Sequence, residues 1–242
     1  YYQFNGLRPG TYRITEQTPD AYLPGQASVG TVNGQSVGNR DASGDVLAGV
    51  VLPAGGEGVN YDFGEILPGS IAGRVIADTN GNCLIDAVGD IPLAGVTIEL
   101  LAANGSVLQT TLTDAGGFYQ FQDLLPGEYG VRERQPSGYF QGGQKAGSGG
   151  GDASTADLIR AIYVTPGSAL FDYDFCEIPP GSIAGFVFVD LDQDCIFDAQ
   201  ESPLAGVNIS LLDSSGNVIA STQTDASGRY QFLGLSPGRY TV

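Results

Sequence analysis

The 242-residue sequence contains no histidine, methionine or tryptophan, and Lys145 is its only lysine. Without histidine there can be no Ser-His-Asp or Cys-His catalytic group, no histidine-ligated zinc and no imidazole general base. No motif of another catalytic class marks a cleft, so we predict that the protein is not an enzyme.

Positive charge is also scarce. The sequence has 27 Asp and Glu residues against 10 Lys and Arg, a formal net charge of −17. Such a chain is repelled by nucleic acids and by anionic membrane surfaces, so we expect neither as a partner, and divalent cations are the natural counter-charge. No apolar run approaches the roughly 18 residues of a membrane-spanning helix, so we expect no membrane insertion of this segment.

Glycine and proline, in contrast, are abundant, with 37 and 13 residues. This composition is typical of short strands joined by turns and disfavours helices. Because 42% of the residues are apolar, the chain has enough hydrophobic surface to bury a core, which excludes a disordered protein.

Internal repeats organise the sequence. The segment Gly-Ser-Ile-Ala-Gly at 69–73 recurs at 181–185, an offset of 181 − 69 = 112 residues. Pro-Leu-Ala-Gly-Val at 92–96 recurs at 203–207, and Tyr-Gln-Phe occurs at 2–4, 119–121 and 230–232. We therefore divide the chain into the C-terminal half of one repeat (1–67), a complete repeat (69–179) and the N-terminal part of a third (181–242). We expect it to be a slice of a longer array.

The complete repeat has the pattern of β-strands throughout. Apolar residues alternate along 96–100, and turn signals such as Asn104-Gly105 separate the segments. The expected strands are residues 71–77, 96–100, 107–113, 118–121, 129–133, 159–164 and 170–175. About seven strands in about 110 residues predict an all-β chain of tandem Ig-like β-sandwiches. The Gly-rich segment 141–151 is expected to be a mobile surface loop.

Regularly spaced carboxylates follow the first strand of the third repeat. With Asp190 as position 1, side-chain oxygens stand at positions 1, 3, 5, 9 and 12, which are Asp190, Asp192, Asp194, Asp198 and Glu201. Ile196 is at position 7, where EF-hand loops use a backbone carbonyl, and the final Glu can bind calcium through both oxygens. Five carboxylates repel one another unless a cation is bound, so we predict a Ca²⁺ site. Cys195 replaces the usual glycine of position 6, so we expect the chain to turn there by another route.

An equivalent loop follows the first strand of the complete repeat. Its oxygens at positions 1, 3, 5 and 9 belong to Asp78, Asn80, Asn82 and Asp86, and Leu84 is at position 7. One inserted residue moves Asp90 to position 13. Because the charges are fewer and the last ligand is displaced, we predict weaker Ca²⁺ binding here, or a water molecule in the gap. A polar turn with solvated carboxylates is the alternative for both loops, but recurrence of the spacing favours calcium.

In sequence order these motifs resemble the SdrD B-like domains of serine–aspartate-repeat surface proteins, which belong with the collagen-adhesin (Cna) B-type domains. The motifs are Gly-Ser-Ile-Ala-Gly-x-Val, the acidic loop, Pro-Leu-Ala-Gly-Val, Thr-Asp-Ala-x-Gly-x-Tyr-x-Phe and Leu-x-Pro-Gly-x-Tyr. The resemblance covers essentially the whole chain. It implies a prealbumin-like β-sandwich, calcium in the loop after the first strand, and a role as a rigid spacer in an extracellular or cell-surface protein. Many Cna B-type domains carry a Lys–Asn isopeptide bond from the first strand, but Arg74 and Phe186 stand there in this sequence, so we expect none.

Three cysteines allow two disulfide pairings. A Cys83–Cys176 bond would close the complete repeat and leave Cys195 to pair elsewhere. A Cys176–Cys195 bond would instead lock the junction between repeats and leave Cys83 unpaired. We favour the first, because a bond between the start and the end of a compact unit closes it most directly. Three buried free thiols remain the alternative to both.

The sequence therefore predicts a structural protein: calcium-stiffened β-sandwich repeats in an extracellular stalk, fibre or filament. Its expected partners are neighbouring copies or repeats of the same protein. An adhesin or carbohydrate-binding module on the same sandwich is the second hypothesis. A binding module should expose an aromatic patch in one repeat only, whereas the aromatic residues here recur in every repeat, which favours the spacer.

Overall fold

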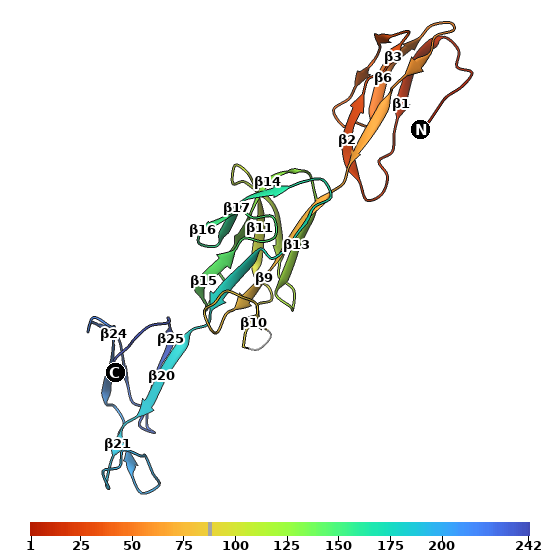
Figure 1. Cartoon of the computed structure of the whole chain (residues 1–242). Coiled ribbons are helices and arrows are strands. Elements are labelled where there is room, and N and C mark those ends of the chain that lie inside the picture. Colours follow the sequence, from red (N-terminus) through yellow and green to blue (C-terminus); the bar gives the residue numbers. More distant parts are fainter. Residues whose placement is uncertain (87–88) are drawn as a thin grey trace.

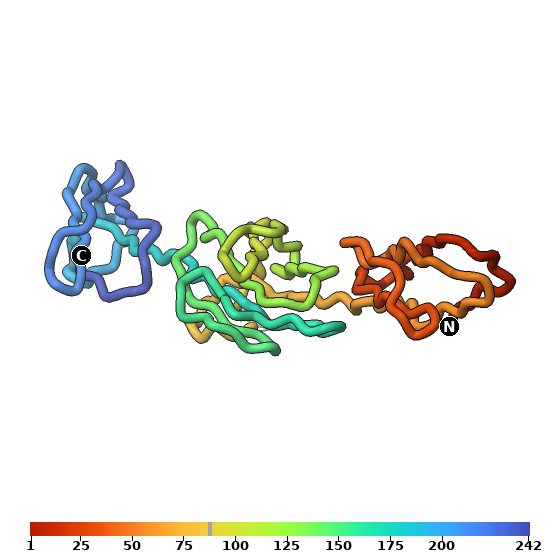
Figure 2. The backbone as a smooth tube through the Cα atoms, turned by 90° about the horizontal axis from the view of Figure 1, so that it is seen from above, coloured from red at the N-terminus to blue at the C-terminus, as the bar shows by residue number. Residues whose placement is uncertain are grey.

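The computed structural model describes residues 1–86 and 89–242 and contains strands, turns and irregular segments in these ranges. Three β-rich units follow one another in a row, the N-terminal unit at one end and the C-terminal unit at the other (Figure 1). A view from a perpendicular direction shows the same row (Figure 2). None of the described residues forms a helix long and apolar enough to cross a membrane.

The middle unit is a sandwich of two sheets. Its strands are β9 (Gly69–Ala77), β10 (Ile91–Pro92), β11 (Thr97–Ala102), β12 (Val107–Leu112), β13 (Phe118–Leu124), β14 (Gly127–Glu133), β15 (Phe140–Lys145), β16 (Asp152–Thr155), β17 (Leu158–Val164), β18 (Ala169–Leu170) and β19 (Asp174–Ile178). One sheet has the order β10-β9-β19-β15, with β13 and β18 also paired to β9. The other has the order β12-β11-β14-β17-β16. β9 therefore lies at the centre of the first sheet.

The core of this unit lies between the two sheets. It contains alternate residues of the facing strands, among them Ile71, Val75, Ile98, Phe121 and Phe175. The hydroxyl of Tyr119 is buried with them and donates a hydrogen bond of 2.5 Å to the carbonyl oxygen of Tyr173. Burying side chains of this size contributes about 1.5–3 kcal/mol each, which makes this core the main stabilising element of the unit.

The strand pattern differs from the sequence prediction in two places. Among the described residues, eight strands of the middle unit have five or more residues, against the seven expected. The additional one is β15, in the segment expected to be a mobile loop; it pairs with β19 through a bulge between Gln141 and Gly143. A Cβ at Gly142 would lie 2.6 Å from the carbonyl oxygen of Cys176, so glycine here permits close strand pairing instead of mobility. The expected strand 170–175 is divided between β18 and β19.

The N-terminal unit has a smaller core. Its strands are β1 (Gly10–Thr15), β2 (Leu23–Ser28), β3 (Thr31–Val32), β4 (Gln35–Ser36), β5 (Asn39–Arg40), β6 (Val46–Leu52), β7 (Gly58–Val59) and β8 (Asp62–Ile66). They form the sheets β1-β6-β5, β2-β8 and β4-β3-β7. The buried residues are Ala27, Val32, Leu47, Val50 and Tyr61.

The C-terminal unit consists of three antiparallel strand pairs. Its strands are β20 (Gly181–Phe186), β21 (Phe188–Val189), β22 (Ser202–Pro203), β23 (Asn208–Leu212), β24 (Val218–Gln223) and β25 (Arg229–Leu235). They pair as β20-β25, β21-β22 and β23-β24. Leu211 and Phe232 are its buried apolar side chains.

Candidate calcium-binding loops

Both acidic loops are closed at their base by paired strands. The 78–90 loop joins β9 to β10, and Ala77 pairs with Ile91 across it. The 190–201 loop joins β21 to β22, and Val189 pairs with Ser202. Each loop is therefore a short insertion whose two ends are fixed by a β-ladder.

In the 78–90 loop the first acidic residue organises the backbone. Asp78 is 2% exposed, and its carboxylate accepts hydrogen bonds from the backbone N–H groups of Asn80 (3.1 Å), Gly81 (2.7 Å) and Cys83 (2.6 Å). These bonds wrap the backbone around the carboxylate at position 1.

The side chains at positions 3, 5 and 9 of this loop converge. The amide groups of Asn80 and Asn82 donate to Oδ2 of Asp86 at 2.8 and 3.0 Å. These two hydrogen bonds, that from Asn80 first, lower the pKa of Asp86 below its ordinary value. Hydrogen bonds thus join the side chains at positions 3, 5 and 9.

The 190–201 loop brings together a different set of positions, 1, 3 and 5, and all three are carboxylates. The carboxylates of Asp190, Asp192 and Asp194 place oxygens within 4.8 Å of one another, while Asp198 and Glu201 are outside this group. Asp190 accepts the N–H groups of Gln193 (2.6 Å) and Cys195 (3.1 Å). Burial acts to raise the pKa of Asp190, but the hydrogen bonds from Cys195 and Gln193 outweigh it, so the pKa is lowered.

The residues at position 7 have exposed side chains in both loops. The N–H of Leu84 donates to Asn82 Oδ1 at 2.7 Å, and the N–H of Ile196 donates to Asp194 Oδ1 at 2.7 Å. The side chains are 52% and 64% exposed, so neither apolar group occupies the interior of its loop. That the backbone carbonyl of position 7 binds the ion remains a prediction.

The last acidic residue closes each loop. Glu201 Oε1 accepts the N–H of Leu191 at 2.8 Å, and Asp198 Oδ1 accepts the N–H of Gln200 at 3.0 Å. Asp90 Oδ1 accepts the N–H of Thr79 at 3.3 Å. The final acid of each loop is thus hydrogen-bonded to the residue that follows position 1.

The turn at position 6 corrects one expectation. Cys83 and Cys195 have φ of 51° and 59°, in the left-handed region that glycine adopts easily. The chain therefore turns through the conformation that glycine would use, with a cysteine side chain in its place. The expectation of a different route is wrong.

Cys83 and Cys176 form a disulfide bond, with their Cα atoms 5.5 Å apart. It joins the 78–90 loop to β19 within the middle unit, so the pairing favoured from the sequence is confirmed. The alternative bond between Cys176 and Cys195 is wrong, and so is the alternative of three free thiols, because Cys195 is the free, exposed cysteine of the described chain.

Sequence reasoning missed the contact that fixes the 78–90 loop to the sheet. The backbone N–H of Asp78 donates to the carbonyl oxygen of Glu177 at 2.7 Å, beside the disulfide at Cys176. A backbone acceptor leaves no residue-type signal; the nearest hint in the sequence is the cysteine next to it.

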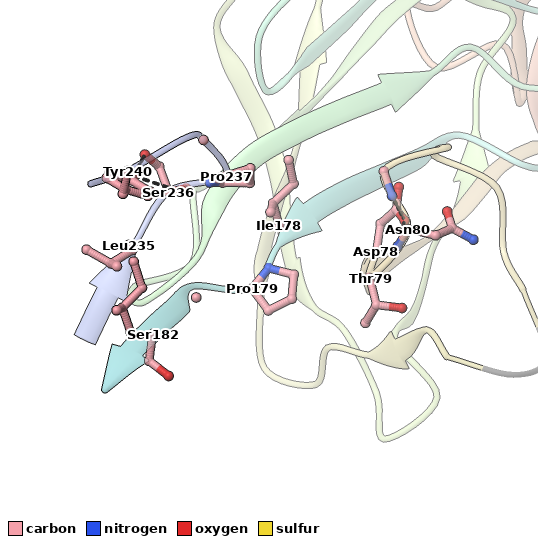
Figure 3. Close-up of a pocket in the computed structure, with 14 residues that line it drawn as sticks. Asp78, Thr79, Asn80, Ile178, Pro179, Ser182, Leu235, Ser236, Pro237 and Tyr240 are labelled. Atoms are coloured by element: carbon pink, nitrogen blue, oxygen red, sulfur yellow. Dashed lines mark hydrogen bonds between the residues drawn. The ribbon is translucent and has the colours of Figure 1, made fainter. Parts of the chain in front are cut away.

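The 78–90 loop lies at the junction with the C-terminal unit. Asp78, Thr79 and Asn80 border a groove of about 470 Å³ whose other walls are Ile178 and Pro179 of the junction and the segment 235–240. Figure 3 shows the three loop residues on one side of Pro179 and Leu235, Ser236 and Tyr240 on the other. The 78–90 loop and the C-terminal unit therefore border the same groove.

Known proteins are similar to this chain in sequence. The family model for the SdrD B-like domain matches residues 69–175 and 181–242. Serine-aspartate repeat-containing protein D of Staphylococcus aureus (strain MSSA476) is 33% identical over 241 residues, covering 100% of this chain and 17% of the relative. Serine-aspartate repeat-containing protein F of Staphylococcus epidermidis (strain ATCC 12228 / FDA PCI 1200) is 32% identical over 243 residues, covering 100% of this chain and 14% of the relative. The chain thus spans less than a fifth of the length of either.

Solved structures include two similar chains at low sequence identity. The Bacillus anthracis TIE protein matches at 14% identity with a TM-score of 0.39, covering 96% of this chain and 44% of the other. The shaft pilin spaA of Lactobacillus rhamnosus GG matches at 14% identity with a TM-score of 0.37, covering 71% of this chain and 84% of the pilin chain.

The chain is all-β, and its middle unit has the two-sheet sandwich that the resemblance implies. Its relatives are surface proteins, which places it outside the cell or on the cell surface. On the match of the family model to both the middle and the C-terminal unit, the chain belongs to the SdrD B-like domain family.

Proposed function

We propose that the chain is a non-catalytic structural element in which calcium, bound by the 78–90 and 190–201 loops, stiffens tandem β-sandwiches into an extracellular stalk, fibre or filament. The observation that carries this proposal is the position of the 78–90 loop at the groove between two units. An ion there would order the segment that borders the neighbouring unit.

The carboxylates of the 190–201 loop repel one another. Asp190, Asp192 and Asp194 hold like charges within 4.8 Å, and bringing such groups together is unfavourable without a cation. Oxygen ligands at this spacing suit Ca²⁺, which takes six to eight oxygens at about 2.3–2.6 Å. Binding would replace mutual repulsion by attraction to one centre and would make each loop a rigid part of its unit.

Proline at the junctions supports the same role. Leu67-Pro68-Gly69 and Pro179-Pro180-Gly181 connect the units through residues whose φ is fixed by the pyrrolidine ring. Short connections of this kind allow few relative orientations. An ordered loop next to Pro179 would restrict them further.

The proposed partners are neighbouring repeats or copies of the same protein, in keeping with the row of units along the chain (Figure 1). The adhesin hypothesis required an aromatic patch exposed in one repeat only. The recurring tyrosine at 119 is instead 2% exposed and hydrogen-bonded in the core, so it has a packing role.

The test uses the whole 242-residue chain. We expect calcium to raise the thermal midpoint and to narrow the distribution of molecular dimensions measured by small-angle X-ray scattering, with EDTA reversing both. Asp86→Asn and Asp194→Asn should each reduce the effect. Asp225→Asn is the matched control, because Asp225 accepts N–H groups in the turn between β24 and β25, outside both loops. A thermal midpoint and a scattering profile unchanged by EDTA would contradict the proposal.

A further inference from the structure

Three acidic side chains outside the two loops meet at one end of the middle-unit core. They are Glu133 at the end of β14, Asp157 in the turn before β17, and Glu177 in β19, and they place carboxylate oxygens within 4.8 Å of one another. Two of them come from facing sheets: Glu133 pairs with Ile98 of the second sheet and Glu177 with Ala77 of the first. Both partners are core residues, so the two Glu side chains share the space between the sheets.

These carboxylates are buried and lack donors. Glu133 is 2% exposed, and within the described part of the chain neither of its oxygens has a hydrogen-bond partner. Glu177 is fully buried; Gln135 donates to its Oε2, while its Oε1 is unpartnered. Asp157 Oδ1 and Gln141 Oε1 are also buried without a donor. Buried polar groups are almost always satisfied, so a group of unpaired acceptors requires an explanation.

Nearby arginines do not neutralise this group. Arg132 and Arg134 flank Glu133 in sequence but donate through Nε to Glu99, at 2.6 and 2.8 Å. Neighbouring residues of a strand point to opposite faces, which explains why the arginines lie away from Glu133. Burial, and then the charge of Glu177, raise the pKa of Glu133 to about 9, so an uncompensated negative charge is costly at this position.

Acidic residues occupy the equivalent positions of the N-terminal unit. Glu16, Asp45 and Glu65 stand at the equivalent repeat positions, 133 − 117, 157 − 112 and 177 − 112. The N–H of Glu16 donates to the carbonyl of Asp45 at 2.9 Å, as the N–H of Glu133 does to the carbonyl of Asp157 at 2.9 Å. Glu16 Oε2 and Glu65 Oε2 are likewise buried and unpartnered. Equivalent positions of the two units thus carry acids with buried, unpartnered oxygens. Of these two sets of described residues, only the acids of the middle unit place oxygens of all three residues within 4.8 Å of one another, and Asp45 accepts a hydrogen bond from Thr18.

We propose that Glu133, Asp157 and Glu177 form a divalent-cation site between the two sheets, separate from the 78–90 loop, and that its ion is calcium. Oxygens that share one Ca²⁺ at about 2.3–2.6 Å can lie up to about 5 Å apart, which matches the spacing of the three carboxylates. Mg²⁺ is less suitable, because it needs shorter bonds and gives up its waters reluctantly, whereas Glu133 and Glu177 are shielded from solvent. The ion would join the two sheets through their side chains at the end of the core.

The test compares calcium stoichiometry in the whole chain. After calcium saturation and desalting, metal analysis of the Glu133→Gln/Glu177→Gln variant should give one ion fewer per chain than the parent, because the amides keep the shape but lose the charge. Glu99→Gln, which removes a buried carboxylate already paired with arginines, should leave the stoichiometry unchanged. The same metal analysis after saturation with Mg²⁺ or Mn²⁺ in place of Ca²⁺ measures how selective the site is for calcium.

Two further variants keep the result interpretable. Asp157→Asn preserves the backbone, because Asp157 has φ of 59° and Asn tolerates this region, so it should fold and still weaken binding. Asp86→Asn/Asp194→Asn should reduce loop binding and leave the inter-sheet ion bound, which separates this site from the proposed loop sites. Equal stoichiometry for the parent, Glu133→Gln/Glu177→Gln and Asp157→Asn would overturn the proposal and would instead indicate a proton shared between the carboxylates.

Discussion

Asp90 and Glu201 accept hydrogen bonds from equivalent backbone N–H groups, although one insertion separates their positions in the two loops. Asp90 receives those of Thr79 (3.3 Å) and Asp86 (2.8 Å), and Glu201 those of Leu191 (2.8 Å) and Asp198 (3.4 Å). The shorter Asp side chain, placed one residue later, thus reaches the same two backbone groups. The insertion does not displace the last acid from the loop, contrary to what its position in the sequence implied.

This equivalence leaves charge as the main difference between the loops, with five carboxylates at 190–201 and three at 78–90. We expect the 190–201 loop to bind Ca²⁺ more tightly, because affinity rises with ligand charge. Asp90→Asn should lower the Ca²⁺ affinity of the 78–90 loop by about 10–100-fold, which is the usual effect of removing a group that orients ligands. Calorimetric titration of this variant and of Glu201→Gln checks both points. A 78–90 loop that binds Ca²⁺ as tightly as its counterpart would contradict the charge argument.

Loss of the disulfide should be costly. Cys83 and Cys176 are separated by 93 residues, and closing a loop of that length restricts the unfolded chain strongly. We expect Cys83→Ser/Cys176→Ser to lower the free energy of unfolding by about 2–5 kcal/mol in urea denaturation. Cys195→Ser is the matched control and should have the same free energy of unfolding as the parent, since Cys195 is exposed and forms no disulfide bond.

Glu99 should make stability depend on pH in the acid range. Burial acts to raise its pKa, but hydrogen bonds from Arg132 and Arg134 prevail and lower it. A carboxyl group whose folded-state pKa is lowered stabilises the protein above its ordinary pKa and loses this effect as the pH falls through the folded-state value. Glu99→Gln should therefore lower the free energy of unfolding by about 1.5–3 kcal/mol at pH 7, and by progressively less below about pH 4. A difference in urea midpoint that stays constant from pH 7 to pH 3 would contradict this assignment.

Gly73 permits the close approach of β9 to the segment before β19. A Cβ there would lie 1.8 Å from the carbonyl oxygen of Tyr173, a backbone atom that cannot move independently. We expect Gly73→Ala to lower the free energy of unfolding by about 3 kcal/mol or more, measured in urea. At Gly10 the nearest atom to a Cβ is 3.8 Å away, so Gly10→Ala should be nearly neutral.

Much of the fold could be predicted because it depends on alternation and turns, which are local. The strands around Val96 and Tyr119 follow from apolar residues at every second position. β15 could not be recognised, because its glycines have no side chains to alternate. Its position depends on the bulged pairing with β19, whose paired residues are 29 to 38 positions apart in the sequence.

The residues of the acidic loops could be predicted from the sequence, but their contacts with the rest of the unit could not. The spacing of Asp78, Asn80, Asn82 and Asp86 is visible in the sequence, and the structure brings the last three together. The acids between the sheets were missed because they are far apart in the chain and match no short motif. Their signal was the repetition of Glu16, Asp45 and Glu65 one unit later.

The disulfide also has a consequence for how the middle unit would bear tension. The chain enters this unit through β9 and leaves through β19, and these strands are parallel neighbours, so a pull on both ends would shear them along their length. The force would pass from β9 through Cys83 to Cys176 and out through β19, bypassing residues 84–175. At roughly 3.3–3.6 Å per residue, the disulfide would prevent residues 84–175 from contributing about 300 Å to the extended length. Under oxidising conditions a stretched array of such units would thus have nearly fixed length, and chemical reduction would make it extensible.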